Sequence, residues 1–234
     1  MKKIVARFAL VYFLISALSV FTSGCQTVQN VWDSTKEIVG IQKRDMMISE
    51  IKDARQSLED VKVQFQSAMD KFNTVLFSKE GKLEEKYKTL KAENEKTGKK
   101  AGDIQKSIDS VIRVSEAVFA EWEAELGQYY SENLRSGSEK RLQEAKSQNN
   151  RFINAMTQAN EKAGPVMAAF NDLVLYSRHN LNSEAGDSLT IELESVKGKI
   201  EAFFQEVDTA KAEADSLLSM MAGSEAAVKS EKTD

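Results

Sequence analysis

The sequence predicts an all-α fold, an elongated antiparallel bundle of about four long, coiled-coil-like helices. Three observations predict it. The 234-residue chain contains a single proline, Pro165. It is rich in Ala, Glu, Lys, Ser and Gln, a composition that favours helix over strand. Its apolar residues recur at alternating spacings of three and four, which is the heptad seam of helices packed side by side.

The first helix is expected to end at Ser78-Lys79-Glu80-Gly81, a predicted turn. Its seam has no polar interruption and comprises Met47, Ile51, Ala54, Leu58, Val61, Phe65, Ala68, Phe72 and Val75. Such regular heptads indicate a left-handed bundle with a thin, continuous core.

A second seam begins in a new phase after Gly81 and has a polar middle. It comprises Leu83, Tyr87, Leu90, Asn94, Thr97, Ala101, Ile104, Ile108, Val111, Ser115, Val118, Trp122, Glu125 and Tyr129. Because Gly98 and Gly102 lie near its polar positions, residues 79–134 have two interpretations: one helix, or a hairpin with its tip near 94–102. We predict one helix, since the apolar phase does not change across the gap.

The third seam follows Ser136-Gly137-Ser138-Glu139, whose spacing from Ser136 to Glu139 predicts a capping box. This seam comprises Leu142, Ala145, Asn149, Phe152, Met156, Ala159, Ala163, Val166, Phe170 and Leu173. Pro165 lies inside it, so we expect one bent helix rather than two.

A turn at Asn180-Leu181-Asn182-Ser183 is expected to precede the fourth helix. The fourth seam comprises Leu189, Leu193, Val196, Ile200, Phe203, Val207, Ala210, Ala214, Leu217 and Met221. Short turns between successive helices predict antiparallel neighbours. The bundle should therefore span 41–222, and the small, charged tail 223–234 should be disordered.

The first two dozen residues have the layout of a secretory signal, with Lys2, Lys3 and Arg7 before an uncharged run from Phe8 to Phe21. That run is 14 residues long, whereas a membrane-spanning helix needs about 20. We predict a signal peptide at 1–24, a lipid anchor and juxtamembrane segment at 25–40, and a soluble, tethered remainder.

Cys25 is the only cysteine, and it directly follows Ser23 and Gly24. This arrangement resembles the lipobox of bacterial lipoproteins, in which the thiol is acylated and becomes the new N-terminus. Thr22 departs from the pattern, because that position is usually Leu, Val or Ile. The alternative is an incidental cysteine behind an ordinary cleavage site. Either way, a single cysteine excludes an internal disulfide.

The exported chain should be acidic, because loss of three cations in 1–24 takes the net charge from −4 to −7. Binding to nucleic acid requires a basic face, so nucleic acid is not an expected partner. Val28, Trp32, Val39 and Ile41 form a short apolar stripe behind Cys25. It is either an interfacial helix on the lipid or an extension of the first helix onto Phe119 and Trp122; we prefer the extension.

No catalytic or metal site is predicted. The only histidine, His179, lacks the glutamate three residues before it that a di-iron bundle needs, and it suits a helix C-terminus. Phosphate-binding and nucleophile-elbow motifs are absent from the sequence. The Ser49-x-x-Lys52 spacing lacks its companion motifs. We therefore expect no cofactor.

Paired carboxylates occur as Glu84 with Glu85 and as Glu121, Glu123 and Glu125. They are expected to be solvated faces of the bundle, because acid and base catalysis needs two carboxylates converging in a cleft. Glu125 alone lies on a seam, below Trp122. A turn toward solvent near Gly127 would explain it.

Several segments together resemble a family of uncharacterised bacterial lipoproteins, domain of unknown function 2959. They are Cys25-Gln26-Thr27-Val28-Gln29, Lys43-Arg44-Asp45, Phe119-Ala120-Glu121-Trp122-Glu123, Gly164-Pro165-Val166 and His179-Asn180-Leu181-Asn182. The resemblance covers nearly the whole exported chain. It implies helical structure and an envelope location, but no reaction, cofactor or catalytic residue.

The expected function is structural: a lipoprotein anchored through Cys25 in the outer membrane and facing the periplasm, acting as a scaffold, spacer or adaptor without catalysis. Gln26 after the cysteine, rather than aspartate, resembles the outer-membrane sorting class. The expected partners are membrane lipid and other proteins, or a second copy through the helices. The alternatives are a membrane-active helical protein of the pore-former type and a carboxylate-based enzyme.

Overall fold

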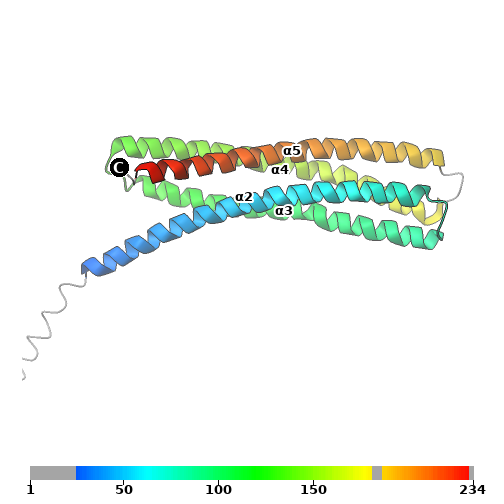
Figure 1. Cartoon of the computed structure of the whole chain (residues 1–234), viewed down its shortest axis with the longest axis horizontal. Coiled ribbons are helices and arrows are strands. Elements are labelled where there is room, and N and C mark those ends of the chain that lie inside the picture. The colour runs from blue at the N-terminus through cyan, green and yellow to red at the C-terminus, as the bar shows by residue number, and fades with distance from the viewer. Residues whose placement is uncertain (1–24, 181–185, 232–234) are drawn as a thin grey trace, which may run out of the picture. The chain divides into compact units, whose positions relative to one another are not determined.

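The computed structural model describes residues 25–180 and 186–231, which form four helices and no strand. The helices are α2 (Cys25–Phe77), α3 (Leu83–Leu126), α4 (Glu132–Asn180) and α5 (Gly186–Glu231) (Figure 1). Side chains are described for 42–180 and 188–222. The predicted all-α fold is confirmed. The predicted signal peptide 1–24 lies outside the described residues.

The chain divides into two compact units, Met1–Lys43 and Arg44–Asp234. The described part of the first unit is the helical start of α2. The second unit is a four-helix bundle, in which α3 packs against α4 and α4 against α5 (Figure 1). α2 completes the bundle, because it makes ion pairs with α5 through Arg55 and Asp215 and with α3 through Asp60 and Lys100.

The predicted heptad seams form most of the core. Every seam position of the third and fourth helices is buried, whereas Val75 at the end of the first seam is partly buried and its neighbour Leu76 is buried instead. Four fully buried phenylalanines from α2, α4 and α5 are in ring-to-ring contact and are here called the phenylalanine layer: Phe65, Phe72, Phe170 and Phe203. The ring centroids of Phe65 and Phe203 lie 4.7 Å apart, and those of Phe72 and Phe170 lie 4.6 Å apart. Burial of each ring contributes about 1.5 to 3 kcal/mol.

α3 is one helix, so the prediction of continuity across residues 94–102 is confirmed. Asn94 and Thr97 are buried inside it rather than exposed at a hairpin tip. The buried part of the seam is shorter than predicted at both ends of α3, because Leu83 and Tyr129 are exposed. The helix stops at Leu126, so Tyr129 lies in the turn that follows it.

The start of α4 differs from the prediction. The predicted capping box at Ser136 and Glu139 lies inside the helix, which already begins at Glu132. Ser131 is the cap: its Oγ accepts a hydrogen bond of 3.4 Å from the backbone N–H of Leu134. The local spacing of Ser136 and Glu139 suits a cap, but the helix had already started one turn earlier.

Pro165 lies inside α4, which is unbroken from Glu132 to Asn180, as predicted. The proline and Gly164 are both exposed, whereas Ala163 and Val166 beside them are buried. A proline on the solvent face leaves the carbonyl four residues earlier, that of the exposed Glu161, open to water. The helix therefore tolerates it without disturbing the core.

Two of the three connections between helices lie within the described residues. The predicted turn after α2 is confirmed, and Gly81 has φ +90°, a left-handed conformation that side chains with a Cβ rarely adopt. The predicted turn around 181–183 lies outside the described residues. α5 continues to Glu231, into the tail that we expected to be disordered from Gly223 onward.

Candidate functional site

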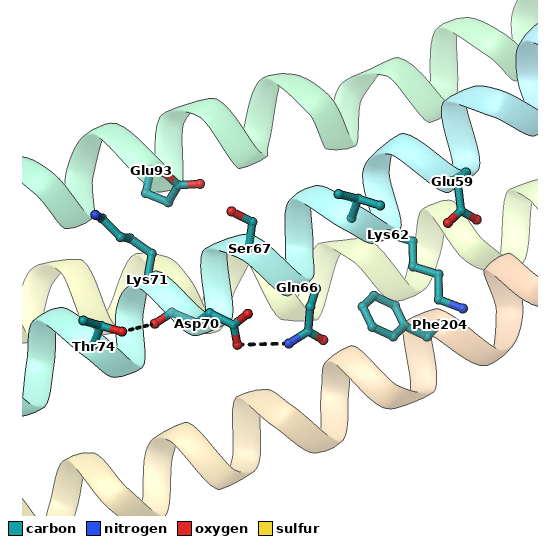
Figure 2. Close-up of a pocket in the computed structure, with 10 residues that line it drawn as sticks. Glu59, Lys62, Gln66, Ser67, Asp70, Lys71, Thr74, Glu93 and Phe204 are labelled. Carbon is teal, nitrogen blue, oxygen red and sulfur yellow. Dashed lines mark hydrogen bonds between the residues drawn. The ribbon is translucent and has the colours of Figure 1, made fainter.

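An open groove of about 820 Å³ runs along the solvent-facing side of α2. Figure 2 shows that most of its side chains come from α2, with Glu93 of α3 on one side and Phe204 of α5 on the other. Its lining comprises Glu59, Lys62, Val63, Gln66, Ser67, Asp70, Lys71, Thr74, Glu93 and Phe204. The groove was not predicted from the sequence, because three helices must come together to form it.

Helical spacing explains how α2 lines the groove. Residues three and four positions apart share one face of a helix, and Val63, Ser67 and Lys71 follow each other at intervals of four. Ser67 lies among longer side chains that line the groove (Figure 2). Val63 is 59% exposed in spite of being apolar.

The charged side chains of the groove make contacts with neighbouring side chains. The ammonium group of Lys62 donates to Asp208 at 2.7 Å and lies 5.1 Å from the centre of the Phe204 ring. Asp70 accepts a hydrogen bond of 3.1 Å from Gln66. Glu59 is paired with Lys211 across the α2–α5 contact. The Lys62–Asp208 and Glu59–Lys211 pairs tie α2 to α5, and the Gln66–Asp70 hydrogen bond lies within α2.

Chemically, the groove suits a shallow contact with another surface. Sites for small molecules usually enclose 70–90% or more of the ligand, whereas this groove is open along its length (Figure 2). Its carboxylates pair with lysines or amides rather than with each other, so the arrangement lacks the convergent pair that acid and base catalysis requires.

Cys25, the predicted lipidation site, is the first residue of α2. α2 continues without a break from Cys25 to Phe77, so the stripe behind the cysteine is part of the first helix. The predicted contact of Trp32 with Phe119 and Trp122 cannot be followed, because the side chain of Trp32 lies outside the described ones. The indole N–H of Trp122 donates to Ser138 Oγ at 2.8 Å.

His179 lies in the last turn of α4 beside Arg178, at the helix C-terminus where the sequence predicts it. Its side chain is exposed. Ser49 and Lys52 are exposed on α2. Within 25–180 and 186–231, no group of three or more His, Cys, Asp or Glu side chains could hold a metal ion.

The carboxylates singled out from the sequence are surface groups. Glu125 is exposed at the end of α3, one residue before the helix ends, which fits the expected turn toward solvent. Glu123 pairs with Lys146 of α4. A hydrogen bond from Lys88, together with the charge of that lysine, lowers the pKa of the Glu84 carboxyl. A lowered pKa favours the ionised form, which is the opposite of what a general acid needs.

Buried polar groups on α3 form a set that the sequence only partly revealed. Asn94 donates to Asn171 of α4, and Asn149 of α4 donates to Ser115 Oγ at 3.2 Å. The two pairs are separated by 21 residues on α3 and 22 on α4, about 32 Å along either helix. Because both pairs form together in a single alignment, they fix the register of α3 against α4.

A third buried group joins α2 to α3. Gln64 donates to Thr97 Oγ1 at 3.0 Å and to Glu93 Oε1 at 2.6 Å. The seam pattern predicts a polar position at Thr97 but gives no signal for Gln64, since it lies beside the seam rather than on it. Its burial depends on the approach of α3.

The family model for the protein of unknown function DUF2959 matches residues 32–221. The chain belongs to the DUF2959 family. The match includes the bundle from Arg44 to Met221, so the fold described above is that of a DUF2959 domain. No curated protein and no solved structure matches the chain. None of the described helices of this DUF2959 chain is long and apolar enough to cross a membrane.

Proposed function

We propose that the mature chain is an outer-membrane lipoprotein that faces the periplasm, is held through an acylated Cys25 and serves as a scaffold, spacer or adaptor without catalysis. The observation that carries the proposal is the continuity of α2, which starts at Cys25 and becomes a core helix of the bundle by Met47. A helix that begins at the lipid attachment site joins the anchor directly to the bundle.

The dimensions and surface of the bundle support this role. α3 has 44 residues, which corresponds to about 66 Å of helix. Its buried residues extend over about two thirds of that length, from Leu90 to Phe119. The groove along α2 is open and supplies a contact surface for a partner rather than an enclosed reaction site.

Membrane fractionation of cells tests the anchor. Wild-type protein should be found in the outer membrane, and Cys25→Ser should release it into the soluble fraction, because the only acylation site is lost. Gln26→Asp is the matched variant for sorting, since it leaves the cysteine intact and should move the protein to the inner membrane. Soluble wild-type protein would disprove the anchor, and wild-type protein in the inner membrane would disprove the placement.

Sedimentation velocity of residues 26–234 tests the spacer role. A protein built from helices of this length should sediment with a frictional ratio well above that of a sphere. A ratio close to that of a sphere would contradict a spacer, whatever the outcome of the fractionation.

A further inference from the structure

The turn between α3 and α4 carries an exposed apolar cluster, Tyr129, Tyr130 and Leu134, here called the tip. Tyr130 is 106% exposed, Leu134 61% and Tyr129 41%. Single exposed apolar residues are ordinary, but a cluster of them marks a contact surface. We propose that the tip is a second membrane contact, which inserts into the interfacial region of the bilayer that holds Cys25. This inference rests on the proposed lipid anchor.

The tip lies at the end of the bundle where α2 enters it. Ser110 of α3 donates to Glu50 of α2 at 2.7 Å, which places these residues at the same level. From Glu50 back to Arg44 is six residues, or about 9 Å. From Ser110 forward to Leu126 is sixteen residues, or about 24 Å. The tip therefore projects about 15 Å beyond the level of Arg44.

The tether keeps a lipid surface within reach of the tip. Cys25 and Arg44 are nineteen residues apart on one helix, so Cys25 stays within about 28 Å of Arg44 in whatever direction that segment points. That length exceeds the roughly 15 Å by which the tip projects beyond Arg44, so it allows the tip to reach the bilayer that holds Cys25. The opposite end of the bundle, at Phe77, is about 50 Å from Arg44 on the far side.

The chemistry of the tip suits a lipid interface. Tyrosine is enriched at both membrane–water interfaces, because its ring is apolar while its hydroxyl stays hydrated. The nearest charges in α4 neutralise each other, since Arg135 pairs with Glu132 at 2.6 Å. The three side chains of the tip carry no charge themselves, and headgroups and the outer acyl region can accept two tyrosines and a leucine.

A fluorescent probe next to the tip tests the proposal in the lipidated mature chain, reconstituted into phosphatidylethanolamine and phosphatidylglycerol vesicles. Because Cys25 is the only cysteine and its sulfur is acylated, Gln128→Cys supplies one free thiol for an environment-sensitive dye. Lys79→Cys, exposed in the turn at the opposite end, is the matched control. Tyr129→Ser with Tyr130→Ser, added to Gln128→Cys, removes the two rings.

We expect a blue shift of the dye at position 128, quenching by lipids that carry a spin label, and neither effect at position 79. Both effects should be lost in the double serine variant, whose melting temperature should not change. Equal dye emission at both positions, on vesicles that carry the protein, would overturn the proposed membrane contact of the tip while leaving the proposed anchor intact. A blue shift without quenching by the labelled lipids would assign the tip to a protein contact and overturn the lipid assignment.

Flotation of the same vesicles separates the two proposals. Vesicles that float with the protein support the anchor independently of the dye. Vesicles that float without it would disprove the proposed anchor, and the tip proposal with it, because the tip depends on the tether for its proximity to lipid.

Discussion

The phenylalanine layer provides the sharpest test of how the bundle is held together. Phe65 is completely buried, and its ring lies 4.7 Å from that of Phe203 and 6.3 Å from that of Phe170, measured between centroids. It therefore joins α2 to both α4 and α5. Phe65→Ala would leave a cavity at the point where three helices meet.

Phe65→Ala should remove a large part of the free energy of unfolding. Phe→Ala in a packed core costs about 3 to 5 kcal/mol, and the aromatic contacts place this site in the upper part of that range. Domains are stable by about 5 to 15 kcal/mol in total. For a domain of 150–250 residues, the melting temperature should fall by roughly 6 to 20 °C.

Urea unfolding of residues 26–234, followed by circular dichroism at 222 nm, measures the loss. Val63→Ala is the matched control, since Val63 lies two residues away on the same helix and is 59% exposed. Its free energy of unfolding should stay within about 0.5 kcal/mol of wild type. If Phe65→Ala lowered the free energy of unfolding no more than Val63→Ala, the phenylalanine layer would not be a packed core, and the described packing of α2 on α4 and α5 would be refuted.

Three further predictions concern the surface. His179→Ala should cost at most about 1 kcal/mol in thermal unfolding, because an exposed histidine at a helix end adds little; loss of a cellular phenotype at unchanged melting temperature would refute a purely structural role. The pKa of Asp60 is lowered from its usual 3.8, first by the hydrogen bond from Gln56 and then by Lys100. The contribution of ionised Asp60 to stability is therefore present above about pH 4 and is lost as the pH falls through the lowered pKa. Acid unfolding should be less steep in Asp60→Asn than in wild type. An unchanged dependence of stability on pH would contradict the pairing of Asp60 with Lys100. Pro165→Ala should stabilise the protein by about 1 to 3 kcal/mol, because an exposed proline inside a helix is unfavourable; a loss of stability in urea unfolding would mean that the proline contributes to the packing of α4.

The core could be predicted residue by residue because heptad spacing is a property of each helix alone. A run such as Phe65, Ala68 and Phe72 defines one apolar face, and that face is buried whichever helix covers it. The prediction failed where a helix ended. Tyr129 continues the spacing of α3, but the helix stops at Leu126, so the side chain is exposed.

The candidate site could be predicted only in part. Cys25 was predicted as a lipidation site from its neighbours in the chain, which needs no folding, and this stays a prediction. The groove along α2 was missed, because Glu93 and Phe204 approach Lys62 only after α3 and α5 have packed on α2 (Figure 2). Ser67 has no feature in the sequence that separates it from other exposed serines.

By itself the sequence determined the all-α fold, the phase of each apolar seam, the continuity of α3 and the single helix across Pro165, because periodicity and helix propensity act within one segment. The tertiary structure decided which residues of different helices pair with each other. It paired Asn94 with Asn171 and Ser115 with Asn149, and so fixed the register of α3 against α4. A heptad pattern repeats every seven residues and is nearly satisfied by a slip of one repeat, whereas the buried amide N–H groups of Asn94 and Asn149 meet these acceptors at one alignment only.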